Sequence, residues 1–149
     1  APHIAAKIDQ VVIDPAHINT CFDEVKSQAQ AVIVEGVGGF RVPLTDSYDT
    51  ADLAQQLGLP VIMVVGLRLG CISQALLTVE AIQARGLQLM GWVANTVDAN
   101  MGHIEANIQA LQQRIPAPLL GHIPRLDQPT AAAAAQFIGA FADTAPHHA

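Results

Sequence analysis

Two hydrophobic patterns alternate along the chain. Largely apolar runs occupy residues 31–34, 60–65, 87–94 and 119–123, while residues 14–25, 51–57, 71–85, 101–115 and 131–141 carry apolar side chains at helical spacing. Short apolar runs are typical of strands buried on both faces of a parallel sheet. Strands that alternate with helices over short loops predict βαβ units with right-handed crossovers. We therefore expect an α/β fold with a mostly parallel sheet.

Helix-capping residues support these boundaries. Asp14 followed by Pro15 is a favourable pair for the N-cap and first position of a helix. Gly58 ends the helix expected at residues 51–57, and Pro60 prevents its continuation. The alanine-rich run that begins at Ala131 is expected to continue as a helix through Phe141.

The first apolar run leads directly into a carboxylate and a glycine-rich turn. After Ala31–Val34 come Glu35, Gly36, Val37, Gly38 and Gly39. A glutamate at the carboxyl end of a parallel strand would lie where open α/β sheets bind ligands. One carboxylate together with phosphate oxygens suits Mg²⁺, and glycines let the backbone approach a phosphate. The alternative is a strand-end glutamate followed by an ordinary turn.

The later strands also end in polar or glycine-rich residues, which are Gly66, Asn95-Thr96 and His122-Ile123-Pro124-Arg125. The Asn95 amide offers a donor and an acceptor that match an adenine edge, although it could instead cap the next helix. Gly70, Cys71 and Ile72 open a helix whose free N–H groups suit an anion such as a carboxylate. Alternatively, Ser73 or water satisfies those donors.

Composition narrows the class of protein. The 149 residues are 51% hydrophobic and 4% aromatic, so the core is expected to be aliphatic. The length fits one domain, which we expect over residues 1–141, followed by a flexible tail at 142–149. A formal charge of −6 argues against a nucleic-acid partner. No apolar run approaches the ~20 residues that span a bilayer, so we expect no membrane partner. Two cysteines make no disulfide framework and favour a reducing cytoplasm.

Taken together, the motifs resemble the dethiobiotin synthetase family over nearly the whole chain. The matching pieces, in family order, are Val32–Phe40, Pro60–Gly66, Leu69–Ile72 with Leu76–Thr78, Gly91–Asn95, Ile115–Gly121 and Ile123-Pro124. The opening Pro2–Ala6 also looks like an internal segment of that family.

The resemblance implies a three-layer P-loop-NTPase-like fold and a ligase of biotin biosynthesis. Such an enzyme uses ATP and Mg²⁺ to join CO₂ to 7,8-diaminopelargonate and close the ring of dethiobiotin, releasing ADP and phosphate. It also implies a homodimer whose substrate site is shared across the interface. By resemblance, Glu35 would bind the metal and Gly36–Gly38 would line the ATP phosphates. Asn95 and Thr96, with Ile123, Pro124 and Arg125, would surround adenine, and Gly70-Cys71-Ile72 would hold the substrate carboxylate.

The chain also departs from the family. No Gly-x-x-x-x-Gly-Lys-Thr motif occurs in it, so the family's phosphate loop and catalytic lysines have no counterpart and the sheet is expected to be incomplete. The chain therefore looks like the C-terminal two-thirds of the enzyme, inactive by itself. Thr96 replaces a frequent aspartate, and Asn107 stands where some relatives have a tyrosine.

Two other functions stay open. One is a related P-loop amidoligase of cobalamin synthesis, or a dethiobiotin-synthetase-like domain fused to another enzyme. The other is a non-catalytic nucleotide-sensing or interaction module. A phosphate loop encoded upstream in frame would favour an enzyme, and its absence would favour the module.

Overall fold

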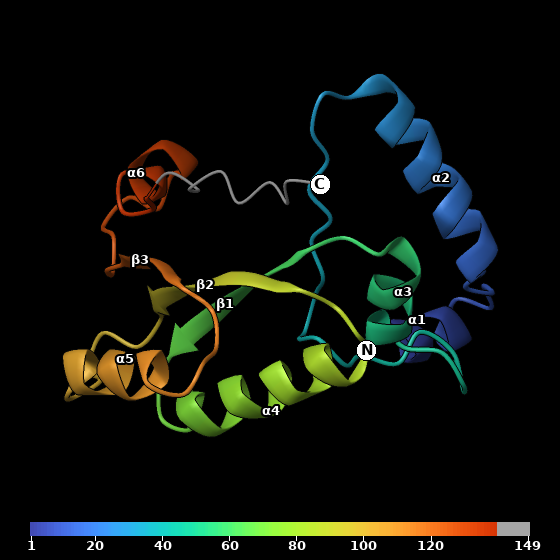
Figure 1. Cartoon of the computed structure of the whole chain (residues 1–149). Coiled ribbons are helices and arrows are strands. Elements are labelled where there is room, and N and C mark those ends of the chain that lie inside the picture. Colours follow the sequence, from blue (N-terminus) through green and yellow to red (C-terminus); the bar gives the residue numbers. More distant parts are fainter. Residues whose placement is uncertain (140–149) are drawn as a thin grey trace. The chain divides into compact units, whose positions relative to one another are not determined.

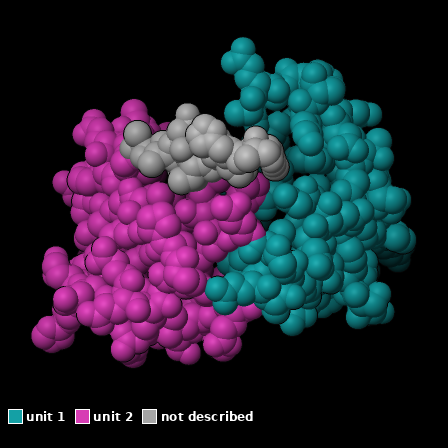
Figure 2. Space-filling view, in the orientation of Figure 1, with its two compact units in different colours: residues 1–59, 81–87 teal, residues 60–80, 88–149 magenta. Residues whose placement is uncertain are grey.

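A computed structural model describes residues 1–139, which fall into two compact units (Figure 2). One unit comprises residues 1–59 and 81–87, and the other comprises the described residues of 60–80 and 88–149. The elements are α1 (Pro2–Ile8), α2 (Pro15–Gln28), α3 (Thr50–Leu57), β1 (Val61–Leu67), α4 (Cys71–Ala84), β2 (Leu89–Thr96), α5 (Ile104–Gln112), β3 (Leu119–Ile123) and α6 (Ala131–Ala135). The expected tail at 142–149 lies outside the described residues, and a single domain over 1–141 stays a prediction.

The second unit is built on a parallel sheet in the order β1-β2-β3. Met63 pairs with Trp92 and Val65 with Ala94, so these side chains share one face of the sheet. Helices α4 and α5 cover that face in Figure 1. The core joins these strand residues to buried side chains of both helices and of the turn after α5, which are Cys71, Ala75, Val79, Ile108, Leu111 and Ile115. The predicted α/β class with a parallel sheet is confirmed.

The first unit shows why α2 and α3 begin where the sequence predicts. The Asp14 carboxylate accepts a hydrogen bond from the Ala16 N–H at 2.9 Å, and Pro15 takes the first helical position. In α3, the buried Asp49 accepts from the N–H groups of Ala51 and Asp52, and the Asp52 side chain accepts from the Asp49 N–H. This reciprocal capping box satisfies donors that the first helical turn leaves free.

The strand predicted at Ala31–Val34 is wrong. The segment forms no regular element, and the exposed fraction reaches 94% at Ile33 and 46% at Val34. A strand satisfies its backbone groups only by pairing with a neighbour. Within residues 1–139 this run has no paired strand, so its apolar composition alone does not make it a strand.

The helix predicted from Ala131 to Phe141 ends early. Helix α6 stops at Ala135, Ile138 forms an antiparallel bridge with Gly121, and the Gly139 N–H donates to the Leu120 carbonyl at 2.8 Å. The returning backbone comes so close that a Cβ on Gly121 would lie 2.0 Å from the Phe137 carbonyl oxygen. Only glycine therefore allows the chain to cover the edge of β3. Phe141 lies outside the described residues.

Strand β1 forms the opposite edge of this sheet and has no partner on its outer side among the described residues. Its side chains alternate, so Ile62 and Val64 point away from the α4–α5 core. They are 44% and 63% exposed. Parallel strands are usually covered on both faces, so the exposure of these two side chains is unusual for a parallel strand.

Candidate functional site

The carboxyl ends of β1, β2 and β3 meet at one edge of the sheet. Gly66 pairs with Asn95, and Asn95 pairs with Ile123, which is the last residue of the β2–β3 ladder. These three residues therefore share the face opposite the α4–α5 core. The structure brings three of the four predicted strand ends together, at the position where parallel α/β sheets bind ligands.

A pocket of about 530 Å³ opens at this edge. Its lining residues are Asn95, Thr96, Val97, Ile123, Pro124, Arg125, Leu126, Asp127, Pro129, Thr130, Ala131 and Ala134. All five residues that the sequence placed around adenine line it. Leu126, Asp127 and α6 were missed, because only the fold brings the start of α6 to the strand ends.

Side-chain hydrogen bonds join the two rims of this pocket, called the strand-end pocket here. The buried Thr96 Oγ1 lies 2.9 Å from Nε2 of the half-buried His122, and Arg125 Nη1 donates to the Val97 carbonyl oxygen at 3.0 Å. The opposite wall begins at Thr130, whose hydroxyl caps α6 by accepting from the Ala133 N–H at 3.2 Å. Thr96 was predicted to contact the nucleotide, but its hydroxyl is engaged by His122.

A second pocket, of about 420 Å³, lies at the start of α4. It is lined by Leu69, Gly70, Ile72, Asp98, Asn100, Met101, Gly102 and Asn107. Gly70 and Ile72 are where the substrate carboxylate was predicted. The Cys71 side chain is instead 2% exposed and packs in the core, and Cys71 is not among the lining residues.

The polar groups of this pocket, called the α4 pocket here, come from α4 and from the segment after β2. The Cys71 N–H donates to the Arg68 carbonyl at 3.0 Å, which leaves Ile72 and Ser73 as the first-turn donors suited to an anion. The Asp98 carboxylate accepts from the Asn100 N–H at 2.9 Å and was missed in the sequence, where it looked like an ordinary loop residue. The Asn107 amide donates to the His103 carbonyl at 2.9 Å.

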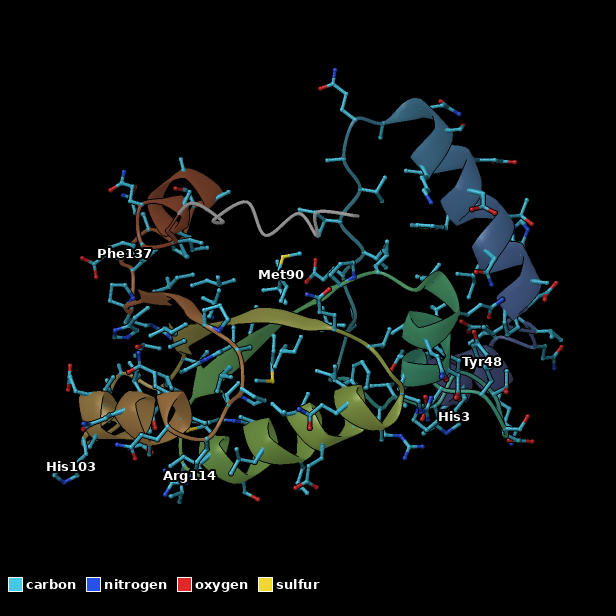
Figure 3. All side chains as sticks on the ribbon, viewed as in Figure 1. His3, Tyr48, Met90, His103, Arg114 and Phe137 are labelled. Atoms are coloured by element: carbon cyan, nitrogen blue, oxygen red, sulfur yellow. The ribbon has the colours of Figure 1, made fainter. Side chains whose placement is uncertain are left out.

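His103 and Cys21 are exposed in the structure. His103 takes the N-cap position of α5 with a positive φ of 59°, and its side chain makes no capping hydrogen bond (Figure 3). Cys21 is exposed on α2, with its Sγ 3.6 Å from His17 Nε2. Within residues 1–139, no group of three or more His, Cys, Asp or Glu side chains is arranged to hold a metal ion.

The predicted metal and phosphate segment lies in the first unit. Glu35 and the glycines after it are exposed, and Gly38 and Gly39 have positive φ values of 87° and 123°. The left-handed backbone anticipated for the glycine turn is present at these two positions but not at Gly36. Because Glu35 does not end a strand, its assignment to Mg²⁺ stays a prediction. One carboxylate with phosphate oxygens and water is nevertheless a donor set that Mg²⁺ accepts.

Among residues 1–139, two ionisable groups have clearly shifted pKa values, and both lie beside α3. Burial opposes ionisation of Asp49, but hydrogen bonds from the Asp52 and Ala51 backbone and from Arg41 outweigh it and lower the pKa of Asp49. Arg41 Nη2 lies 2.8 Å from the Asp49 carboxylate. Burial, followed by the charges of Asp52 and Asp49, raises the pKa of Tyr48, whose hydroxyl donates to Gln56 at 2.6 Å (Figure 3).

Comparison with known proteins identifies the relatives of this chain. A family described as "AAA domain" matches residues 1–133. The ATP-dependent dethiobiotin synthetase BioD of Janthinobacterium sp. (strain Marseille) is 62% identical over 138 residues, which is 93% of this chain and 58% of that protein. The enzymes of the same name from Aromatoleum aromaticum and Ralstonia nicotianae are 64% and 54% identical over 126 and 138 residues. These matches cover 85% and 93% of this chain, and 56% and 60% of the two enzymes.

The chain thus spans little more than half the length of these curated relatives. The resemblance to dethiobiotin synthetases inferred from the sequence is confirmed, and so is the P-loop-NTPase-like fold class. No helix within residues 1–139 is both long and apolar enough to cross a membrane.

Proposed function

The chain belongs to the AAA-domain family, and from this premise we propose that it is the adenine- and substrate-binding part of an ATP-dependent dethiobiotin synthetase. The observation that carries the proposal is the strand-end pocket, which we assign to the nucleotide and call the nucleotide pocket from here on. It unites Asn95 with Ile123, Pro124 and Arg125 at the carboxyl edge of a parallel sheet. The 62% identity to an enzyme of that name supports the same assignment.

The reaction proposed is the ATP-driven formation of dethiobiotin from 7,8-diaminopelargonate and CO₂. One substrate amine takes up CO₂ as a carbamate, and the terminal phosphoryl group of ATP is transferred to a carbamate oxygen, releasing ADP. The second amine then attacks the activated carbon, a C–N bond closes the ring, and phosphate leaves. Activation of this kind is needed because a carbamate oxygen is a poor leaving group without the phosphoryl group.

Each predicted residue has a distinct part in this proposal. The Asn95 amide donates to and accepts from the adenine edge, while Pro124 and Ile123 pack against the base. The N–H groups at the start of α4 bind the substrate carboxylate beside the apolar wall of Leu69 and Ile72. Glu35 would hold Mg²⁺, and the bound metal would supply positive charge to offset that of the phosphates.

Turnover also needs groups that these 149 residues do not supply. They contain no Gly-x-x-x-x-Gly-Lys-Thr motif, whose backbone N–H groups and lysine cradle phosphates. We propose that a phosphate-binding segment equivalent to the unmatched part of the relatives completes the site, and that this chain alone is inactive. A cytoplasmic location, which suits a biosynthetic enzyme with free Cys21 and Cys71, belongs to the same proposal.

A homodimer assembled through α4 is also proposed. Leu69, just before this helix, is 96% exposed, and Leu77 within it is 62% exposed. Large apolar side chains grouped on a surface often mark an interface. Leu69 also lines the α4 pocket, which we assign to the substrate and call the substrate pocket. A partner placed on this surface would therefore help to enclose it.

The test is a dethiobiotin-formation assay with ATP, Mg²⁺, bicarbonate and diaminopelargonate. The chain is assayed alone and with the unmatched segment of the Janthinobacterium enzyme added in trans. We expect product only in the complemented reaction, and loss of that product in Glu35→Gln but not in the control Glu24→Gln on α2. Product from the chain alone would contradict the need for the added segment. ADP binding without turnover in either reaction would favour a non-catalytic nucleotide-binding module.

A further inference from the structure

The backbone ladder between β2 and β3 ends at the base of the nucleotide pocket. Asn95 and Ile123 form its last pair, and the pocket rims continue as separate loops through Val97 and Arg125. Backbone hydrogen bonds therefore fix the spacing of the rims only up to their base. Beyond that point, side chains must hold the two rims apart at a fixed distance.

We infer that Thr96 and His122 are positioning residues that set the width of this pocket and so its preference for a purine base. Thr96 Oγ1 and His122 Nε2 are 2.9 Å apart and join β2 to β3 next to the last ladder pair. Strand alternation sends both side chains to the face opposite Asn95 and Ile123. They can therefore hold the rims from behind without competing with the base for space.

Burial makes the hydrogen bond between Thr96 and His122 stronger than the one from Arg125 to Val97, which also joins the two rims. Thr96 is 7% exposed, so water does not readily replace its partner, and losing one partner of a buried hydrogen bond leaves the other unsatisfied. The hydroxyl can donate or accept, so the bond forms with either histidine tautomer. The bond from Arg125 to the Val97 carbonyl is exposed and is expected to contribute less.

The inference rests on the proposed function, because it concerns the same nucleotide pocket. Its experiment measures dissociation constants of ADP and CDP for the full chain by titration calorimetry. The variants are Thr96→Val, Thr96→Ser, His122→Leu and the double variant Thr96→Val/His122→Leu. Thr20→Val is the matched control, since the Thr20 hydroxyl donates to the Ala16 carbonyl within α2, and no residue of α2 lines this pocket.

The expected result is weaker ADP binding when either partner is lost. Thr96→Val and His122→Leu should each raise the ADP dissociation constant about 3- to 10-fold, the range for one net hydrogen bond, and reduce the ADP-over-CDP preference. Thr96→Ser keeps the hydroxyl and should restore both values, which simple loss of packing would not explain. The double variant should bind no more weakly than the worse single variant, because both remove one interaction. Wild-type affinity and preference in both single variants, or fully additive losses, would overturn the inference.

Amide hydrogen exchange in the nucleotide-free chain provides a second readout. Exchange at Val97 and Arg125 should accelerate in Thr96→Val and His122→Leu but not in Thr96→Ser or Thr20→Val. If the wild-type chain binds neither nucleotide, the proposed function has failed, and exchange alone decides the inference. Unchanged exchange in both disrupting variants would then overturn it.

Discussion

Asn95 carries the most specific chemical assignment at the level of single residues. Its position at the end of a strand was evident from the sequence. The structure pairs Asn95 with Ile123 and places both in the lining of the strand-end pocket. The amide can form two hydrogen bonds with an adenine edge, which is the basis for discriminating between bases. The side chain of its neighbour Thr96 lies on the other face of the sheet, where it contacts His122, so Asn95 is free to contact a base in the proposed function.

Replacing Asn95 tests the adenine assignment. Asn95→Ala should weaken ADP binding by about 1–3 kcal/mol, the range for a bidentate base contact, and should leave the melting temperature nearly unchanged. The matched control is Asn19→Ala, because the Asn19 amide donates to the Pro15 carbonyl within α2 at 2.8 Å. Calorimetry that gives equal ADP affinity for wild type and Asn95→Ala would exclude this contact.

Asp49 is the residue whose ionisation should affect stability most clearly. Its pKa is lowered in the folded state, so its carboxylate stabilises the fold fully above the ordinary value of 3.8. This contribution is lost as the pH falls through the lower folded value. Asp49→Ala should therefore reduce the free energy of unfolding by about 1–2 kcal/mol at pH 7, as expected for loss of an N-cap, and by less below pH 3.8.

The measurement is urea unfolding at pH 7 and pH 3. Asp46→Ala is the control, since the Asp46 side chain is 93% exposed and its Oδ1 lies 3.9 Å from Lys7 Nζ. This substitution should change the free energy of unfolding by no more than about 0.5 kcal/mol. An Asp49→Ala cost that stays constant or grows towards pH 3 would show that charge is not the source of the stabilisation.

At the level of elements, hydrophobic pattern and capping residues predicted the helices and strands that have local signals. Asp14 marks the start of a helix and Gly58 the end of another in both the sequence and the structure. The pattern failed at Ala31–Val34, because strand formation depends on a pairing neighbour that a single run does not reveal. It also failed after Ala135, where contact with Gly121 prevails over the helical preference of the sequence.

Gly121 should be intolerant of any side chain. In Gly121→Ala, the new methyl group would meet the Phe137 carbonyl and force residues 137–139 away from β3. Overpacking of this kind costs about 1–3 kcal/mol, measurable by urea unfolding. Gly102→Ala is the control, because a Cβ there meets nothing within 4 Å, and its effect should stay within about 0.5 kcal/mol. Equal stability of the two variants would refute the close approach at Gly121.

At the level of the whole molecule, the sequence predicted the fold class and five of the twelve residues that line the strand-end pocket. It could not predict α6 as a wall of that pocket or the contact between Thr96 and His122. Both depend on positions that only the tertiary structure brings together, since 26 residues separate Thr96 from His122. Nor could it show that the Cys71 side chain packs in the core and not in the pocket at the start of α4.

Self-association should have two separable sources. Sedimentation of the chain at micromolar concentration is expected to show a dimer that Leu77→Arg dissociates, because Leu77 is exposed on α4. Val25→Arg is the control on α2, where Val25 is similarly exposed at 55%. Larger aggregates are expected from the open edge of β1, and Ile62→Lys should suppress them without affecting the dimer. A monomeric wild-type chain would contradict the proposed α4 interface.

The most direct test of adenine binding at the ends of β2 and β3 is an NMR titration of the isotope-labelled chain with ADP. If the pocket at the ends of β2 and β3 binds adenine, saturable shifts should appear at the Asn95 side-chain amide and at the backbone amides of Ile123 and Arg125. Cytidine diphosphate should produce smaller shifts at the same concentration. Saturable shifts confined to other parts of the chain, or none at these three residues at millimolar ADP, would contradict the account.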